Sequence, residues 1–419
     1  MNFTKLFTVL ALLSACSVWA DYGYDRPPIV RYNTSGKEGY ASLVCHGCRY
    51  GHDVVINKRS TAQFTPEGIV TNGKNMAIFN IPWLYPGTPL SVTFLADVTL
   101  HEIKRGVIVG RTGWDNSLGI REDGKAFFNV FGRDGKGAEI VSKTTLKTGV
   151  PYRLAAVLDC SRDNKSYLEL YVNGNLEATG VLPQPPREYS REIYAGGIAF
   201  NRDGSIRGGL ACTIHELNFY YKDLTRTEIC NVAGNIDKSK WTAFKPVVEY
   251  GKTKPAREIT DNGVTACLFK TPETYESMTF TALVKVNEIP KQGVSIGGRP
   301  GYDNGLFLRP DGRFAISVWN AAKSESLSHP GNTIVKPGET YRVTAVVHNR
   351  DVETIVTLYV NGKLDGQQAI AGRIFPYGDE IWVKGYAAGS ELRNAFSCGE
   401  LLDFRAWGIA LPFDMAQNL

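Results

Sequence analysis

An internal repeat of about 188 residues constrains the fold of this chain more than any other feature of its sequence. The segment GRTGWDNSL at residues 110–118 aligns with GRPGYDNGL at residues 298–306. The segment LYVNG occurs at residues 170–174 and again at residues 358–362, at the same offset of 188. This period is far longer than the repeats of 20–50 residues that build solenoids. The sequence therefore predicts two whole domains in tandem, each long enough to bury its own core.

Each copy carries the local signals of antiparallel β-structure. Short runs rich in Val, Leu, Thr and aromatic residues recur at residues 90–98, 152–158, 279–286 and 341–347, as is typical of strands. Asn-Gly or Asp-Gly pairs occur between such runs and supply the positive φ angles of two-residue hairpin turns. These pairs are Asp123-Gly124, Asn173-Gly174, Asp311-Gly312 and Asn361-Gly362. Helical periodicity is almost absent, so we expect an all-β fold.

The order of these motifs resembles the LamG-like jelly roll of the concanavalin A-like lectin/glucanase superfamily. The resemblance covers about residues 69–234 and 264–411, and it implies two tandem antiparallel two-sheet jelly-roll sandwiches. After its late Glu-Leu-x-Phe strand, the first copy offers a capping box of Thr225 and Glu228, which predicts a short helix. The second copy has Pro412 and its neighbours there, so no capped helix is predicted at its end.

The first twenty residues predict an export signal. Lys5 precedes an apolar run at residues 6–13, and Ala20 ends a stretch suited to signal peptidase. This uncharged stretch is shorter than the roughly 20 residues that span a bilayer, and no later segment is apolar enough, so no transmembrane segment is predicted. Residues 13–16 also resemble a bacterial lipobox, which leaves a lipid anchor at Cys16 open. We expect a secreted or cell-envelope protein.

The predicted domain organisation follows from the repeat and the signal. A linker is expected where apolar runs are few and several lysines occur. The predicted parts are a signal peptide at residues 1–20, a first LamG-like jelly roll with an N-terminal extension at residues 21–235, a linker at residues 236–254 and a second LamG-like jelly roll at residues 255–419.

The cysteines favour disulfide bonding, because exported thiols usually pair. Removing Cys16 from the eight cysteines leaves seven, so at least one is a free thiol or is bonded to another chain. Cys45 and Cys48 have a zinc-like spacing, but no second CxxC completes a zinc site. In the resembled fold the strand of Cys267 lies beside the late strand after Phe396, which implies a disulfide between Cys267 and Cys398. No connectivity is predicted for Cys45, Cys48, Cys160, Cys212 and Cys230.

Charge and composition exclude several classes of partner. The 47 Lys and Arg residues are nearly balanced by 42 Asp and Glu residues, and no basic cluster could follow a phosphate backbone. Nucleic acid is therefore not an expected partner. With 21% charged and 43% hydrophobic residues, the chain is neither disordered nor a coiled coil.

No catalytic residue is predicted, and we expect a protein that is not an enzyme. Ser295 stands in a G-x-S-x-G pattern, but no helix follows it, and the first copy has Val107 at that position. The glucanases of the resembled superfamily carry E-x-D-x-x-E on one strand, and neither copy has this motif. Glu400 and Asp403 come nearest, but three residues apart they would point to opposite faces of a strand.

The candidate binding site is the turn Gly-Arg-x-Gly-[Trp/Tyr]-Asp-Asn. Its aromatic ring suits the apolar face of a sugar, and its polar groups can hydrogen-bond hydroxyls. A purely structural role stays open, because Asp-Asn pairs satisfy their own backbone in turns and an aromatic ring can cap a core. Because Trp is larger than Tyr, the first copy is expected to bind better. The candidate residues are Arg111, Trp114, Asp115, Asn116, Arg299, Tyr302, Asp303 and Asn304.

No metal site is predicted, and calcium is the only cofactor that the sequence suggests. Asp159, Ser161 and Asp163 are spaced like the start of a calcium loop. The loop lacks a glycine at its sixth position, and the second copy does not repeat the pattern.

These observations together predict an exported, non-catalytic protein that recognises extracellular carbohydrate. One alternative is a structural or adhesive surface protein whose partner is another protein. Another is a divergent polysaccharide-active enzyme whose carboxylates carry no recognisable motif. Glycan-array binding that is lost with Trp114 would favour carbohydrate recognition over adhesion.

Overall fold

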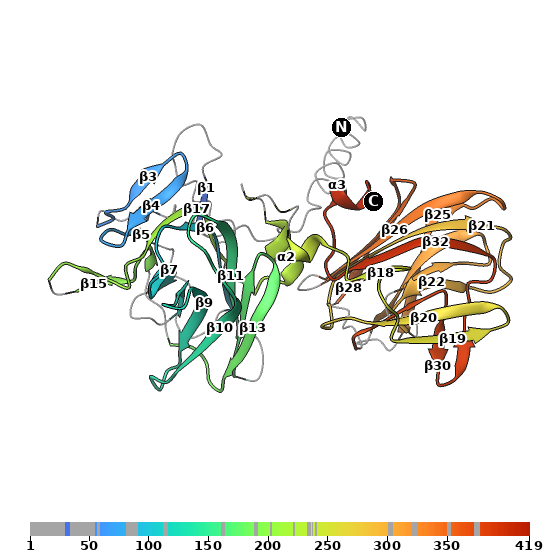
Figure 1. Cartoon of the computed structure of the whole chain (residues 1–419), viewed down its shortest axis with the longest axis horizontal. Coiled ribbons are helices and arrows are strands. Elements are labelled where there is room, and N and C mark those ends of the chain that lie inside the picture. The colour runs from blue at the N-terminus through green and yellow to red at the C-terminus, as the bar shows by residue number, and fades with distance from the viewer. Residues whose placement is uncertain are drawn as a thin grey trace, which may run out of the picture. The chain divides into compact units, whose positions relative to one another are not determined.

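The computed structural model divides the chain into two compact units, residues Met1–Lys238 and Ser239–Leu419 (Figure 1). The structure describes residues 30–33, 55–56, 59–80, 91–111, 116–160, 164–187, 192–201, 203–220, 223–232, 236, 238, 241–300, 305–320, 325–349, 353–372 and 378–419. The predicted signal peptide, Cys16, Cys45 and Cys48 lie outside these residues.

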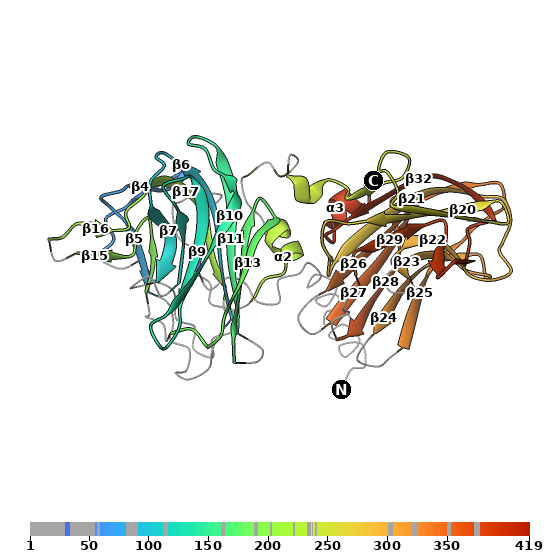
Figure 2. The ribbon, with the colours of Figure 1, turned by 60° about the horizontal axis from the view of Figure 1, so that its bottom comes forward.

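The first unit is a sandwich of two antiparallel sheets, with a small ribbon beside them (Figures 1 and 2). The eight-stranded sheet has the order β13 (Asn175–Leu182), β12 (Ser166–Val172), β11 (Pro151–Asp159), β6 (Val92–Leu100), β17 (Ala211–Tyr220), β4 (Gly68–Asn72) and β3 (Gln63–Thr65), and β1 (Val30–Asn33) also pairs with β17. The seven-stranded sheet has the order β10 (Gly137–Thr145), β9 (Lys125–Phe131), β8 (Asn116–Ile120), β7 (Gly106–Arg111), β14 (Glu192–Ala195), β5 (Ala77–Asn80) and β2 (Val55–Ile56). The ribbon consists of β15 (Ala199–Phe200) and β16 (Ile206–Arg207).

The second unit is built in the same way. Its six-stranded sheet has the order β18 (Val248–Glu249), β32 (Gly399–Trp407), β21 (Met278–Val286), β26 (Thr340–Asn349), β27 (Glu353–Val360) and β28 (Lys363–Ala371). Its seven-stranded sheet has the order β19 (Arg257–Asp261), β20 (Val264–Lys270), β29 (Glu380–Val383), β22 (Val294–Gly298), β23 (Gly305–Leu308), β24 (Arg313–Asn320) and β25 (Glu325–Ile334). The ribbon consists of β30 (Tyr386–Ala388) and β31 (Glu391–Arg393).

The strand order confirms the tandem two-sheet fold predicted from the repeat. Strands β7, β8, β9 and β10 correspond in place to β22, β23, β24 and β25, and β6 and β17 correspond to β21 and β32. The hairpin of β3 and β4 is an addition to the first unit. Within the stretch of residues 236–254, β18 pairs with β32 and so belongs to the second unit.

The core of each sandwich is organised by aromatic residues on its central strands. In the first unit the rings of Phe94 and Phe219 lie 5.1 Å apart, and both side chains are fully buried. Their counterparts Phe280 and Phe404 lie 6.3 Å apart in the second unit. The predicted hairpin turns also form, since Asn173 and Asn361 both have φ of 50°.

The predicted capping box forms at the start of α2 (Arg226–Asn231), where the Thr225 hydroxyl and the Glu228 carboxylate bond each other's backbone N–H. Four residues also form a helix near the end of the second unit, α3 (Phe413–Ala416), without a side-chain cap. The absence of a cap agrees with the loss of the motif, and the helical turn itself persists. No helix among the described residues is long and apolar enough to cross a membrane.

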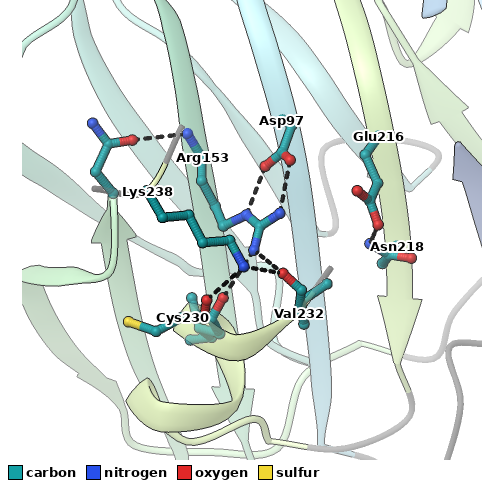
Figure 3. Close-up of polar contacts among 9 residues, drawn as sticks. Asp97, Arg153, Glu216, Asn218, Cys230, Val232 and Lys238 are labelled. Carbon is teal, nitrogen blue, oxygen red and sulfur yellow. Dashed lines mark hydrogen bonds and ion pairs between the residues drawn. The ribbon is translucent and has the colours of Figure 1, made fainter. Parts of the chain in front are cut away.

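A buried charge network fixes α2 to the eight-stranded sheet (Figure 3). Arg153 on β11 is fully buried and donates two hydrogen bonds of 2.7 Å to the Asp97 carboxylate on β6. Its remaining Nη1 donates to the carbonyl oxygen of Val232 at 2.5 Å, just beyond the last turn of α2. A cation at a helix C-terminus stabilises carbonyl groups that have no partner within the helix. Arg153 therefore joins the sheet to the helix.

Lys238 supplies a second cation to the same helix end (Figure 3). Its Nζ donates to the carbonyl oxygens of Cys230 and Val232, at 2.8 and 2.5 Å. Burial, and after it the nearby Arg153 charge, lower the pKa of the Lys238 amine to about 8. Both of these Lys238 hydrogen bonds go to backbone oxygens at the helix end, so we assign Lys238 a structural role.

The predicted disulfide between Cys267 and Cys398 is not formed in the structure, where both are buried free thiols. The prediction placed the strand of Cys267 beside the late strand of its domain. However, β20 pairs with β19 and β29, whereas Cys398 directly precedes β32 in the other sheet. Burial raises the pKa of the Cys398 thiol to about 11. Cys160, Cys212 and Cys230 are also buried free thiols.

Replacing Arg153 with Leu should destabilise the first unit by about 3–5 kcal/mol, because Asp97 would remain as an unpaired buried charge. The matched control is Arg342→Leu in the second unit, whose side chain is 28% exposed and pairs with Asp403. This pair is partly exposed to solvent, and solvent-exposed pairs contribute about 0–1 kcal/mol, so its loss should cost less than that of the fully buried pair. Urea unfolding, read by hydrogen exchange on peptides from each unit, measures both effects, and equal losses would contradict the account.

The Lys238 amine should make the first unit more stable as the pH rises from about 8 to about 10.5. Its pKa is about 8 in the folded protein and 10.5 as a model value, so the unfolded state binds more protons in this interval. The free energy of unfolding of the native protein, minus that of Lys238→Met, should therefore rise with pH. Urea titrations between pH 7 and 10 test this, and a flat or falling difference would refute it.

Candidate functional site

The described part of the candidate turn begins at the ends of β7 and β22. Trp114, Asp115, Tyr302, Asp303 and Asn304 lie outside the described residues. Their proposed contacts with a sugar therefore stay predictions.

The three described residues of the turn point into the sandwiches. Arg111 is 2% exposed, and its guanidinium lies 5.8 Å from the centre of the Phe219 ring in the core. Arg299 is 3% exposed and donates to the carbonyl oxygens of Tyr275 and Gly378, at 2.9 and 2.8 Å. Asn116 is fully buried.

Strand alternation explains this placement. Arg111 follows the core residue Val109 by two positions, and Asn116 precedes the core residue Leu118 by two, so each shares the core-facing side of its strand. Arg111, Asn116 and Arg299 therefore lie buried at the base of the turn, and their role as ligand contacts stays a prediction.

The structure also places the remaining chemical candidates that lie among the described residues. Ser295 is 4% exposed in the middle of the antiparallel strand β22, where no strand-to-helix elbow exists. Asp159 ends β11, but Ser161 and Asp163 lie outside the described residues. In the part of the chain that the structure describes, no group of three or more His, Cys, Asp or Glu side chains could hold a metal ion.

A row of side chains crosses the face of the first unit's seven-stranded sheet that is turned away from the core. Successive cross-strand partners define this outer row, and each residue alternates with core-facing neighbours. Tyr194, for example, stands between the core residues Ile193 and Ala195. The outer row consists of Ile78, Tyr194, Gly110, Ser117, Asn129 and Glu139.

The middle of the outer row offers small polar groups beside a residue without a side chain. The Ser117 hydroxyl is buried and has no hydrogen-bond partner. A Cβ added to the neighbouring Gly110 would lie 2.7 Å from that hydroxyl oxygen, so only glycine leaves room there. The amide of Asn129, 8% exposed, follows on the next strand.

Charged groups meet at the β10 end of the outer row. The Glu139 carboxylate accepts a hydrogen bond of 2.6 Å from Arg105 and lies 3.5 Å from a guanidinium nitrogen of Arg121. The Arg105 guanidinium also lies 4.8 Å from the centre of the Phe127 ring, within the range of a cation–π contact. This end combines an aromatic ring, a carboxylate and two cations, and the Arg105, Arg121 and Glu139 side chains are 27–42% exposed.

The other end of the outer row carries an aromatic residue with a satisfied hydroxyl. The Tyr194 hydroxyl donates to Glu192, whose carboxylate also binds Arg59. The hydrogen bond that Arg59 donates to Glu192 raises the pKa of the Arg59 guanidinium. Tyr194 also packs against Ile206 of the β15–β16 ribbon.

The second unit repeats the row with different chemistry. Trp382 replaces Tyr194, and both lie beside the glycine of the Gly-Arg turn. Glycine and serine residues replace Ser117, Asn129 and Glu139, so the carboxylate and the amide are lost. The second row consists of Leu268, Trp382, Gly298, Gly305, Ser317 and Ser328.

Neither row could be predicted from the sequence, because a row depends on the register between strands that are far apart in the chain. The correspondence between the aromatic residues of the two rows could have been found from the sequence. Tyr194 and Trp382 stand 188 residues apart in the segments EIYA and EIWV, the same offset that identified the repeat.

Solved structures with some likeness to this chain include carbohydrate-binding and laminin domains. A sialidase carbohydrate-binding module of Ruminococcus gnavus, bound to α2,3-sialyllactose, is 14% identical with a TM-score of 0.32, over 41% of this chain and 98% of that one. Domains LG4–5 of the mouse laminin α1 chain are 14% identical with a TM-score of 0.30, over 85% of this chain and 96% of that one. At such TM-scores these likenesses define neither a ligand nor a site.

A putative carbohydrate-binding protein of Bacteroides ovatus is 13% identical with a TM-score of 0.29, over 82% of this chain and 78% of that one. No curated protein matches the chain.

The family assignment rests on a sequence match together with the repeated two-sheet architecture. The model of the concanavalin A-like lectin/glucanases superfamily matches residues 87–230 and 260–414. These ranges fall one in each structural unit and cover most of the chain. The chain therefore belongs to the concanavalin A-like lectin/glucanases superfamily, with two copies of its domain in tandem.

Proposed function

We propose that the protein is an exported, non-catalytic carbohydrate-binding protein whose main binding surface is the outer row of the first unit. One observation carries this proposal. On one sheet face, a tyrosine, a serine hydroxyl and an amide, all buried in this structure, and a partly exposed carboxylate bound to arginine are joined by cross-strand pairing. Carboxylate, amide and hydroxyl groups can hydrogen-bond sugar hydroxyls, while aromatic rings suit their apolar faces.

The predicted aromatic turn supports the same location. Arg111 ends β7 and Asn116 begins β8, so the turn that contains Trp114 joins these strands. Gly110 and Ser117 of the outer row are the last paired residues before this turn. Trp114 would therefore be attached next to the middle of the outer row, which makes a stacking role for its ring consistent with the proposed surface.

A binding role is favoured over hydrolysis because the outer row holds one carboxylate. Glycoside hydrolysis uses two carboxyl groups, about 5–9.5 Å apart, on either side of the scissile bond. Glu139 is the only carboxylate of the outer row, and both of its oxygens face guanidinium groups. Export is part of the proposal and rests on the predicted signal at residues 1–20.

Replacing Glu139 with Gln should weaken glycan binding by about 10- to 100-fold, because a hydrogen bond to a charged group contributes about 1.5–3 kcal/mol. Asn129→Ala should also weaken it. The matched control is Glu122→Gln, an exposed carboxylate outside the outer row, which should bind like the native protein. A glycan array on the mature protein selects the ligand, and calorimetry on variants shown to be folded measures the affinities.

Two results would overturn the proposal. If no glycan binds while a surface protein does, the adhesive alternative is correct. If glycans bind with the same affinity to Glu139→Gln and Asn129→Ala, the binding surface lies elsewhere.

A further inference from the structure

We propose that Trp382 is the aromatic platform and hydrogen-bond donor of a second sugar subsite, which the β30–β31 ribbon covers and uncovers. The class of ligand rests on the proposed function. The subsite itself lies in the second unit and uses none of the residues of the first unit's outer row.

The indole of Trp382 points to a ligand because its N–H has no acceptor. Trp382 is 3% exposed, and its Nε1 is buried without a hydrogen-bond partner. Its strand neighbours Ile381 and Val383 lie in the core, so the indole faces away from the core. Buried indole N–H groups usually find a partner. An acceptor that enters from outside the chain, such as a sugar hydroxyl oxygen, would satisfy this donor.

The surface beside the indole lacks bulky side chains. Gly298 is the cross-strand partner of Trp382, and Gly305 is the partner of Gly298. The Phe307 ring lies over Gly305, because a Cβ there would come 2.6 Å from it. Strand β22 lies between the strands of Trp382 and Phe307 and contributes Gly298 here. Adjacent strands are about 4.8 Å apart, so the strands of Trp382 and Phe307 are separated by about 10 Å. We infer that this glycine-lined stretch between two aromatic residues admits a neutral sugar ring when the ribbon lifts.

The β30–β31 ribbon covers this surface in the structure. Tyr386, Ala387 and Leu392 of the ribbon pack against Trp382 and its neighbours in one apolar cluster. Figure 1 shows β30 beside β19 and β20, and residue contacts join β30 to β20 and β31 to β19. The cover is therefore made by side-chain packing together with a hydrogen bond of 3.2 Å from the Arg257 guanidinium to the Gly389 carbonyl oxygen.

The base of the ribbon has the backbone geometry of a hinge. The chain enters the ribbon through Lys384 and Gly385, with φ of 68° and 125°, and leaves through Asn394, with φ of 49°. Backbone hydrogen bonds fix this base, from Ser295 N–H to the Asn394 carbonyl at 2.8 Å and from Lys384 N–H to the Ile296 carbonyl at 2.9 Å. Another, from Phe396 N–H to the Lys384 carbonyl at 3.2 Å, joins the two ends of the ribbon. Rotation about these left-handed positions would lift the ribbon while the base stays attached.

The first unit has a paired donor at the position that corresponds to Trp382. Tyr194 occupies the position of Trp382, and its hydroxyl donates to Glu192. The ribbon of the first unit therefore covers an aromatic residue whose polar group already has a partner.

Exchange of the Trp382 indole N–H with deuterium tests whether the β30–β31 ribbon lifts from Trp382. The resonance is assigned in the full-length protein by its loss in Trp382→Phe. We expect it to exchange at least about tenfold faster than core amides of β21 and β26. Asn394→Gly should accelerate it severalfold by loosening the hinge. The matched control is Asn361→Gly, at a hairpin asparagine with φ of 50°, and it should have no effect. Exchange only at the rate of global unfolding, or exchange insensitive to Asn394→Gly, would overturn the proposal.

Titration with sugars separates this inference from the proposed function. The probes are lactose, cellotriose and chitotriose, added to the Glu139→Gln protein while the Trp382 indole resonance is followed. A shift of this resonance, with about tenfold weaker binding by Trp382→Phe, supports the subsite. If the sugars shift resonances of Ser117 and Asn129 in the native protein but never that of Trp382, the subsite is refuted and the proposed function stands. If neither set shifts, both are refuted.

Discussion

Burial of both faces of the central strands is the constraint on which the rest of the structure depends. One face of β6 packs Phe94 into the sandwich core, while its other face packs Leu95 beneath α2. The same holds in the seven-stranded sheet, where every residue of β7 and β8 is buried. A two-sheet sandwich covers only one face of each sheet. The helix α2 and the two ribbons are therefore needed to complete the burial.

Polar groups that lie under these covers must find partners or remain unpaired at an energetic cost. Under α2 the solution is complete for the charged groups, since Arg153 bonds both Asp97 and the carbonyl oxygens at the helix end, whereas the Oδ1 of Asn218 on β17 has no partner. Under the β30–β31 ribbon it is incomplete, since the Trp382 indole N–H has no acceptor. This contrast separates a structural network from a candidate binding position.

The two copies keep the scaffold and vary the polar groups. At the seam between the sheet edges, Glu177 accepts the backbone N–H and the hydroxyl of Thr144, and Asp365 does the same for Thr333. On the outer faces the copies differ, because Glu139 corresponds in place to Ser328. The groups that join the sheets are thus retained in both copies, whereas the polar groups of the outer faces have diverged.

Sequence patterns predicted what depends on local geometry. The Asn-Gly turn at Asn173 and the capping box at Thr225 formed as expected, since each involves residues only a few positions apart. The side of the sheet that Arg111 faces could not be predicted, because the strand bulge between Val107 and Val109 sets the alternation there. The Cys267–Cys398 pairing failed for a related reason, since it required knowing which sheet each strand joins.

The central claim is that glycan binds along the outer row of the first unit. Hydrogen exchange of the full-length protein, measured by mass spectrometry with and without a saturating glycan, tests it most directly. The account predicts slower exchange in peptides from β8, β9 and β10. Protection confined to β11, β12 and β13 of the opposite sheet, with no change in β8 to β10, would contradict it.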